Sequence, residues 1–247
     1  MTRRRWIADE VGGDTAALLG EHAAHLARVL RAEVGEAFEI ATGDEVRLGR
    51  ITSISDVRVE FALGEVRAIQ PLPKITLALA IFKFDRMEWA IEKCTEIGVS
   101  RIIPVIARRS DAHLAAAATK RQERWQRIVR QAAEQSRRSG PPEIAAPVKL
   151  KDLAGSGVLA DASTRVVLAE SLAGAERGTR LGDVLQSRPP AVALAVGPEG
   201  GWTDEELAWF HESGWVAASL GDTILRAETA AIVATALAFE LLRSCGP

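Results

Sequence analysis

Residues 74–220 repeat one pattern, in which short apolar runs alternate with helical segments, and this alternation constrains the fold more than any other feature. The runs are KITLALAI (74–81), RIIPVI (101–106), RVVLAE (165–170), AVALAV (191–196) and WVAASL (215–220). Continuous apolar runs of this length are typical of strands covered on both faces, as in parallel sheets. The sequence therefore predicts an α/β domain with a mainly parallel sheet.

Two amphipathic helices are predicted between these strands. In DRMEWAIEKCTEIGV, apolar residues fall on one face, Asp85 suits an N-cap and Gly98 suits a C-terminal stop. In residues 120–142, Trp125 and Val129 are expected inward and the arginines outward, with an end at the Gly-Pro-Pro sequence.

The hydrophobic pattern of the first 70 residues is different. Residues 25–31 are spaced as a short helix, and 37–42, 45–54 and 57–63 read as strands separated by turn residues. These strands predict a small barrel or meander. Two prolines in QPLPK interrupt the pattern, so we expect domains at 1–70 and 74–247.

Charge, cysteine content and hydropathy bear on three questions: nucleic-acid binding, disulfides and membrane association. The net charge of −2 taken alone argues against a nucleic-acid partner, but residues 101–151 carry 12 Lys and Arg against 4 Asp and Glu. Such a block suits contact with phosphate, or is a solvated helix face. Cys94 and Cys245 cannot build a disulfide framework, and the sequence has no apolar run of membrane-spanning length. We expect a cytoplasmic protein with no membrane association.

Two loops stand out because each follows the carboxyl end of a predicted strand, where open α/β sheets bind ligands. In GPEGGWTDEE, Gly197, Gly200 and Gly201 allow backbone to approach a ligand, and Thr203 with Glu206 predicts a capping box. An ordinary strand-to-helix turn is the alternative. The second, SLGDTILRAETAA, places Arg226 and Glu228 just before a very apolar helix over 229–243.

These two segments resemble the C-terminal signatures of the RsmE-type 16S ribosomal RNA methyltransferases, a family of the SPOUT superfamily. DRMEWAIEKCTEIGVSRIIPV with ARRS, and KRQERWQRIVRQAAEQSRRSGPPEI, resemble its central segments. HLARVLRAEVGE with TGD resembles its N-terminal PUA-like domain. The resemblance covers nearly the whole chain and is weakest over 152–188.

The resemblance implies a trefoil-knot SPOUT methyltransferase domain behind a PUA-like β-barrel, working as a homodimer. It also implies S-adenosyl-L-methionine as cofactor, held between the strand end at 168–170 and the two signature loops. The cofactor residues implied are Leu168, Glu170, Gly197, Glu199, Gly200, Gly201, Leu220, Gly221, Ile224, Leu225, Arg226 and Thr229.

The implied reaction is methylation of N3 of one uridine in 16S rRNA of the small ribosomal subunit. It requires a deprotonated imide and no metal, and the four scattered histidines suggest none. Arg226 is the candidate to stabilise the deprotonated base, with Glu228 or Glu199 as orienting or proton-accepting groups. The alternatives are another SPOUT activity, on a ribose 2′-oxygen or another base, and a non-catalytic RNA-binding assembly factor.

Arginines of the basic block and of the N-terminal region are the candidates for RNA contact. A track of cations along RNA would bind its phosphates, although helix arginines are also found simply solvated. The predicted RNA-binding residues are Arg3, Arg4, Arg28, Arg31, Arg108, Arg109, Arg137 and Arg138.

Overall fold

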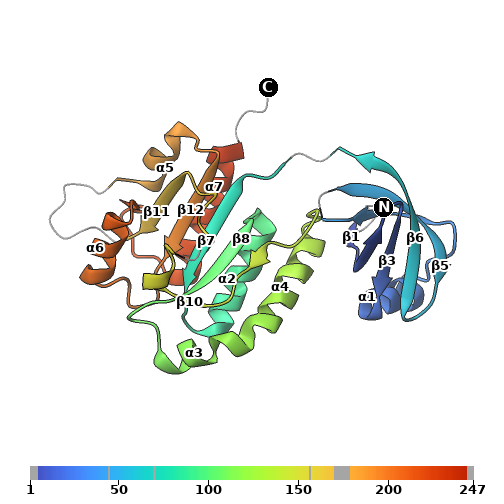
Figure 1. Ribbon diagram of the computed structural model, residues 1–247, viewed down its shortest axis with the longest axis horizontal. Coiled ribbons are helices and arrows are strands. Elements are labelled where there is room, and N and C mark those ends of the chain that lie inside the picture. Colours follow the sequence, from blue (N-terminus) through green and yellow to red (C-terminus); the bar gives the residue numbers. More distant parts are fainter. Residues whose placement is uncertain (1–4, 44, 69–70, 156, 170–178, 244–247) are drawn as a thin grey trace. The chain divides into compact units, whose positions relative to one another are not determined.

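The computed structural model describes residues 5–43, 45–68, 71–155, 157–169 and 179–243. The chain divides into two compact units. Unit 1 comprises residues 1–71 together with 133–141, and unit 2 comprises residues 72–132 and 142–247. Each unit has a sheet of its own (Figure 1).

Unit 1 contains a curved six-stranded sheet in the order β1-β4-β5-β6-β3-β2 (Figure 1). Only the β1–β4 pair is parallel among these strands, and β5 and β6 pair with two register shifts. Bulges of this kind bend a sheet and increase its twist. The strands are β1 (Arg5–Ile7), β2 (Glu10–Gly12), β3 (Thr15–Leu19), β4 (Ala37–Ala41), β5 (Val46–Ile54) and β6 (Arg58–Arg67).

The strands predicted over 37–63 are confirmed, whereas the prediction that a helix precedes every strand was wrong. Strands β1, β2 and β3 come first, and helix α1 (Gly20–Ala24) begins earlier than expected. It continues as a π-helical turn over His25–Val29. The three-residue strands β1 and β2 give too few alternations for a period to be recognised.

The core of unit 1 lies inside the curve of its sheet. Trp6, Leu18 and Ile40 are fully buried there with Leu26 from the π-helical turn. Gly49 lies where β5 crosses this core, and a Cβ atom on it would come within 2.5 Å of the Ile40 side chain. A glycine is therefore required at this point of the sheet.

The segment 133–141 completes unit 1 from far along the chain. Ala133 is buried with Ile7, Ala41 and Val46. The Nε2 atom of His22 lies 3.3 Å from Oε1 of Glu134. Unit 1 is thus built from two separate stretches of sequence, which no sequence pattern indicated.

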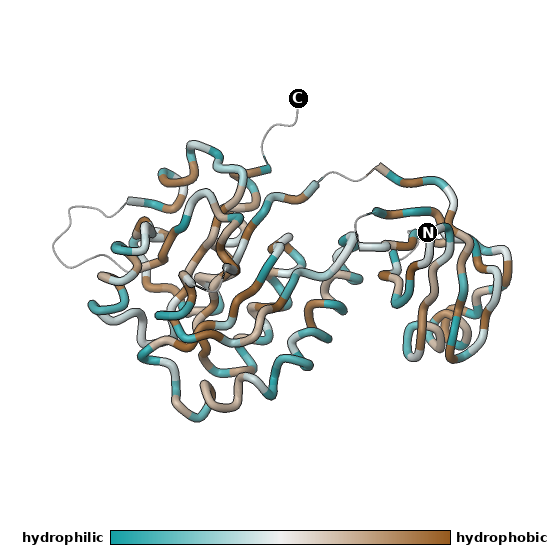
Figure 2. Tube along the Cα trace, in the orientation of Figure 1, coloured by the Kyte–Doolittle hydropathy of each residue, from teal (hydrophilic) through white to brown (hydrophobic). Residues whose placement is uncertain are grey.

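Unit 2 contains a parallel sheet, as predicted, in the order β10-β8-β7-β12-β11-β13, with β9 paired to β8. Four of the five apolar runs of the sequence form its central strands β8, β7, β12 and β11 (Figure 2), and the fifth, WVAASL, forms the edge strand β13. The strands are β7 (Lys74–Ala80), β8 (Arg101–Ile106), β9 (Glu143–Ile144), β10 (Val148–Lys149), β11 (Thr164–Leu168), β12 (Ala191–Val196) and β13 (Val216–Ala218).

The two faces of this sheet differ in side-chain size. On β7 and β12, Leu77 and Leu194 point into one cluster, whereas Ala78 and Ala195 point into the other. The first cluster is covered by helices α2, α4, α5 and α7, and the second is packed by the aromatic residues of α6 and its neighbours. Alternate residues of a strand face opposite sides, so one run supplies both cores.

Helices α2, α4, α6 and α7 of unit 2 match predicted segments with shifted ends, and α4 ends at Gln135, before the Gly-Pro-Pro sequence; α3 and α5 were not predicted. Helix α2 has Lys83 rather than Asp85 at its N-cap, so that prediction was wrong, and Asp85 lies in the first turn. Helix α7 starts two residues earlier than predicted, which puts Glu228 inside it. The helices are α2 (Phe84–Ile97), α3 (Ala112–Ala117), α4 (Gln122–Gln135), α5 (Leu181–Val184), α6 (Asp204–Glu212) and α7 (Ala227–Arg243).

Helices α2 and α7 pack closely against each other. The Thr235 hydroxyl lies 3.4 Å from Sγ of Cys94, and both side chains are buried. Gly98 ends α2 with φ of 131°, and a Cβ atom there would lie 2.5 Å from the Phe239 ring. These contacts lie toward the C-terminal ends of both helices and hold them side by side. At their beginnings, where the candidate site lies, Arg86 of α2 is 3.5 Å from Glu228 of α7.

Candidate functional site

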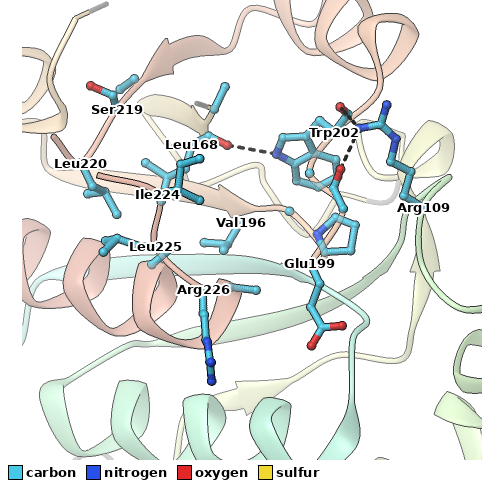
Figure 3. Close-up of a pocket in the computed structure, with 18 of the residues that line it drawn as sticks. Arg109, Leu168, Val196, Glu199, Trp202, Ser219, Leu220, Ile224, Leu225 and Arg226 are labelled. Carbon is cyan, nitrogen blue, oxygen red and sulfur yellow. Dashed lines mark hydrogen bonds between the residues drawn. The ribbon is translucent and has the colours of Figure 1, made fainter. Parts of the chain in front are cut away.

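A pocket of about 480 Å³ lies at the carboxyl ends of β11, β12 and β13 in unit 2 (Figure 3). Its walls come from the segment after β12 (197–202) and the segment between β13 and α7 (219–226), the two loops predicted from sequence. Its volume lies in the range of about 300–1,000 Å³ that is typical of small-molecule sites. The pocket is therefore large enough for a cofactor.

Aliphatic side chains form one wall of the pocket. Leu168 ends β11, Val196 ends β12, and Leu220, Ile224 and Leu225 come from the segment before α7 (Figure 3). Ile224 is 78% exposed despite its apolar side chain. An apolar side chain held open at a pocket suits a flat apolar ligand group packed on it.

The glycine loop after β12 forms the opposite wall and is held by Trp202. The indole Nε1 of Trp202 donates to the Leu168 carbonyl at 3.1 Å (Figure 3). A Cβ atom on Gly197 would lie 3.2 Å from that same nitrogen. Gly201 has φ of +69°, a conformation that favours glycine. Bare backbone at the pocket is thus a consequence of how tightly the loop packs.

Arg109 fixes the same loop from the end of β8. Its Nη1 donates to the Gly200 carbonyl at 2.7 Å and to the Trp202 carbonyl at 3.2 Å (Figure 3). Arg109 was predicted from sequence to contact RNA, and in the structure its guanidinium donates to these two loop carbonyls. A Cβ atom on Gly200 would lie 3.3 Å from Cδ of Arg109.

The capping box predicted for α6 is confirmed beside this loop. The Thr203 hydroxyl accepts from the Glu206 amide, and the Glu206 carboxylate accepts from the Thr203 amide at 2.8 Å. Glu206 also accepts from the Arg108 amide at 2.7 Å. The helix start is therefore tied to the end of β8 as well as to the glycine loop.

Charged groups gather where the pocket meets α2 and α7. Arg86, in the first turn of α2, lies 3.5 Å from carboxylate oxygens of both Glu199 and Glu228. Arg226 lines the pocket and forms no ion pair with any residue that the structure describes. Its carbonyl accepts from the Ala230 amide at the start of α7. Positively and negatively charged side chains therefore both lie beside the apolar wall of the pocket.

The structure brings most of the predicted cofactor residues together. Two predicted residues, Thr229 and Glu228, do not line the pocket, and Glu170 lies outside the described residues. Sequence reasoning missed Arg86, Trp202 and Ser219 among the lining residues. The lining residues predicted from sequence are Leu168, Gly197, Glu199, Gly200, Gly201, Leu220, Gly221, Ile224, Leu225 and Arg226.

The predicted RNA-contact arginines of unit 1 have varied surroundings. Arg28 lies 2.6 Å from an Asp56 oxygen, and the hydrogen bond to that carboxylate raises the pKa of Arg28. Arg31 and Arg137 adopt left-handed backbone with φ of 50° and 58°. Burial lowers the pKa of Arg138 to about 10. Arg3 and Arg4 lie outside the described residues.

Across the described residues, no three His, Cys, Asp or Glu side chains are grouped as metal ligands. None of the described helices is both long and apolar enough to cross a bilayer.

Comparison with known proteins gives a consistent family. Residues 70–238 match the family model of the RNA methyltransferase domain. The chain is 36% identical over 228 residues to ribosomal RNA small subunit methyltransferase E of Synechocystis, covering 89% of this chain and 71% of that protein. It is 32% identical to the Bacillus subtilis protein of the same name, covering 93% and 92%.

Solved structures agree with these sequence relatives. A ribosomal RNA small subunit methyltransferase E from Neisseria gonorrhoeae, bound to S-adenosyl methionine, is 30% identical with a TM-score of 0.79, covering 95% of each chain. A putative methyltransferase from Legionella pneumophila, in complex with the same cofactor, is 31% identical with a TM-score of 0.78, covering 96% of this chain and 97% of that one.

Proposed function

This chain belongs to the RNA methyltransferase family that includes the ribosomal RNA small subunit methyltransferases E, and from that premise we propose the target atom and the residues of its reaction. It is an S-adenosylmethionine-dependent methyltransferase of small-subunit ribosomal RNA. The proposed target is N3 of a uridine in 16S rRNA, as the sequence resemblance implies.

The pocket of unit 2 is the observation that carries the proposal. Its aliphatic wall suits an adenine ring, and the exposed backbone of the glycine loop suits hydrogen bonds to the ring edge and to the amino-acid end of the cofactor. A Cβ atom at Gly197 or Gly200 would be crowded by the side chain of Trp202 or Arg109, which favours glycine at both positions. The residues present therefore fit S-adenosylmethionine.

Methylation at N3 requires the protein to align the base with the cofactor and to remove the proton from N3. S-adenosylmethionine, when bound, supplies a sulfonium methyl group. Uridine N3 is protonated and hidden in a base pair, so the base must be presented unpaired or flipped. Arg226 is the residue we assign to stabilising the negative charge of the deprotonated imide, and Glu199 or Glu228 to orienting the base or accepting its proton.

We assign unit 2 to the SPOUT trefoil-knot class and the N-terminal region to a PUA-like RNA-binding domain, with the functional division near residues 70–74. The support is the family resemblance, the parallel sheet of unit 2 and the curved sheet of unit 1. Ribosomal RNA as substrate implies a cytoplasmic location.

A homodimer is part of the proposal, through the outer face of α7. Its inner face is covered by α2 and the sheet, whereas Leu237 on its outer face is 41% exposed. Trp89 on α2 is 48% exposed. Large apolar groups left open on two neighbouring helices suit a second copy of the chain.

Two alternative functions differ from uridine N3 methylation in the atom that would carry the methyl group. Another SPOUT activity would place the methyl group on a ribose oxygen or another base. A non-catalytic assembly factor would place none, although the retained pocket favours an enzyme.

Nucleoside mass spectrometry of 16S rRNA tests the proposal. RNA from cells that lack this gene is expected to lose 3-methyluridine at one site, and the wild-type gene is expected to restore it. Loss of a 2′-O-methylated or other methylated nucleoside instead would identify the alternative activity. An unchanged nucleoside profile would support the assembly factor.

A further inference from the structure

One arginine lies between the two acidic residues considered for proton transfer. Arg86 Nη1 is 3.5 Å from Oε1 of Glu199 and 3.5 Å from Oε1 of Glu228. The three residues come from α2, the glycine loop and α7, which are far apart in the sequence. Within the described part of the chain, Arg86 has these two carboxylates as its ionic partners.

The two carboxylates differ in their access to the pocket. Glu199 lines it, and its side chain is 42% exposed. Glu228 does not line it, and its side chain is 7% exposed. A proton acceptor must reach the base and later release its proton to water, and Glu199 meets both requirements.

Glu228 has the surroundings of a fixed counter-ion. Its Oε2 is buried and has no hydrogen-bond partner among the described residues, while Oε1 faces Arg86. A buried carboxylate is stabilised by a nearby cation, and the cation is held in turn by the carboxylate. The position of Glu228 near the N-terminus of α7 adds to this stabilisation.

We propose that Arg86, held in place by buried Glu228, is a positioning residue that orients Glu199 to accept the N3 proton of the uracil ring. The inference rests on the proposed function. In this step the N3–H bond breaks and the proton passes to a Glu199 oxygen. N3 then bonds to the methyl carbon, the electron pair of the broken S–CH3 bond stays on sulfur, and Glu199 returns its proton to solvent.

A double-mutant cycle separates this role from an ordinary ion pair. Glu199→Gln is expected to lower kcat about a hundredfold, as loss of a general base does. Arg86→Met is expected to lower kcat about tenfold in the wild-type background and by less than about twofold in the Glu199→Gln background. Because both residues line the cofactor pocket, kcat is measured at saturating S-adenosylmethionine, and calorimetry gives the cofactor affinity of each variant.

Matched controls test whether Arg86→Met lowers kcat merely by destabilising the fold or by removing a positive charge from α2. Lys93→Met removes another cation of α2, one that pairs with Glu92 and Glu96, and is expected to retain wild-type kcat. Arg86→Met leaves Glu228 buried without its cation and is expected to lower the Tm. The double variant Arg86→Met/Glu228→Gln is expected to recover the Tm and not kcat.

The outcomes distinguish failure of the proposed function from failure of the role assigned to Arg86. If the wild type forms no 3-methyluridine, the proposed function fails and the role of Arg86 falls with it. If 3-methyluridine forms but the costs of Arg86→Met and Glu199→Gln multiply, Arg86 does not act through Glu199. Recovery of kcat in Arg86→Met/Glu228→Gln would likewise reduce Arg86 to a stabilising ion pair.

Discussion

At the scale of single residues, Arg108 and Arg109 are neighbours in sequence with different roles in the fold. The Arg109 guanidinium donates hydrogen bonds to two carbonyls of the glycine loop. Arg108 instead donates through its backbone amide, to the carboxylate of Glu206. Sequence reasoning treated the two as equivalent surface cations. The acceptors of Arg109 lie 91 and 93 residues away, and no local pattern shows a contact at that separation.

Arg109→Ala is expected to weaken S-adenosylmethionine binding about tenfold, because hydrogen bonds from a charged donor contribute about 1.5–3 kcal/mol and the loop loses two of them. Isothermal titration calorimetry measures the change. Arg108→Ala is the matched control and is expected to bind the cofactor as the wild type does. Equal weakening by both substitutions would mean that general positive charge, rather than the loop contact, supports binding.

Cys94 is expected to be chemically inert in the folded protein. Burial raises the pKa of its thiol from 9.0 to about 12, against a smaller lowering by the Thr235 hydroxyl. Because the folded pKa is the higher one, the stability that this thiol contributes is fully present below pH 9 and is lost as the pH rises toward 12.

The measurement is reaction with a thiol reagent at pH 8 in a Cys245→Ser background. The native protein is expected to react about a hundredfold more slowly than the same variant unfolded in guanidinium chloride. Equal rates would show that Cys94 is accessible, contrary to its burial between α2 and α7.

At the scale of elements, segments with a clear apolar run or period were predictable from sequence, and the first strands of unit 1 were not. Strands β7 and β12 are buried on both faces and read as continuous apolar runs, and α2 has a clear apolar stripe. Strands β1 and β2 have three residues each, and β2 is exposed throughout. Pairing with another strand, β4 for β1 and β3 for β2, makes these segments extended, rather than a local period.

Thr203→Ala is expected to destabilise the protein by about 1 kcal/mol, because it removes the side-chain cap of α6. For a chain of this size the Tm is expected to fall by about 2–4 °C. Differential scanning calorimetry measures the shift, with Glu212→Ala at the exposed end of the same helix as the control. An unchanged Tm would mean that the Glu206 contacts to β8 hold the helix start by themselves.

At the scale of the whole molecule, the two signature loops of the site were predictable and its charged border was not. The first loop stands out by its three glycines, and both loops follow the carboxyl ends of predicted strands. Arg86 lies in the first turn of a helix whose sequence also suits a purely structural role, and its carboxylate partners are more than 100 residues away. Its part in the site follows only from tertiary packing.

The proposed homodimer makes a specific prediction about α7. Leu237→Glu is expected to convert a dimer into a monomer at micromolar concentration in sedimentation velocity, because it buries a charge in an apolar interface. Val57→Glu changes an exposed valine of unit 1 and is the control expected to leave the dimer intact. A wild-type monomer would contradict the proposal outright.

The proposed RNA contact predicts a dependence on salt. Arg28→Ala/Arg31→Ala and Arg137→Ala/Arg138→Ala are each expected to weaken binding to an rRNA fragment, and each lost phosphate contact to flatten the log–log salt slope by about 0.7–0.9. Arg58→Ala, which breaks ion pairs to Glu10 and Glu60, is the control. Unchanged slopes in both pairs would place the RNA elsewhere on the protein.

The two-part composition of unit 1 also has a consequence for protein synthesis. When the ribosome has made residue 71, the buried Ala133 and the Glu134 partner of His22 are still about 60 residues from being translated. At about 5–20 residues per second, that delay lasts several seconds. The nascent N-terminal region must therefore wait, with part of its core uncovered, until more than a third of the following unit has been translated.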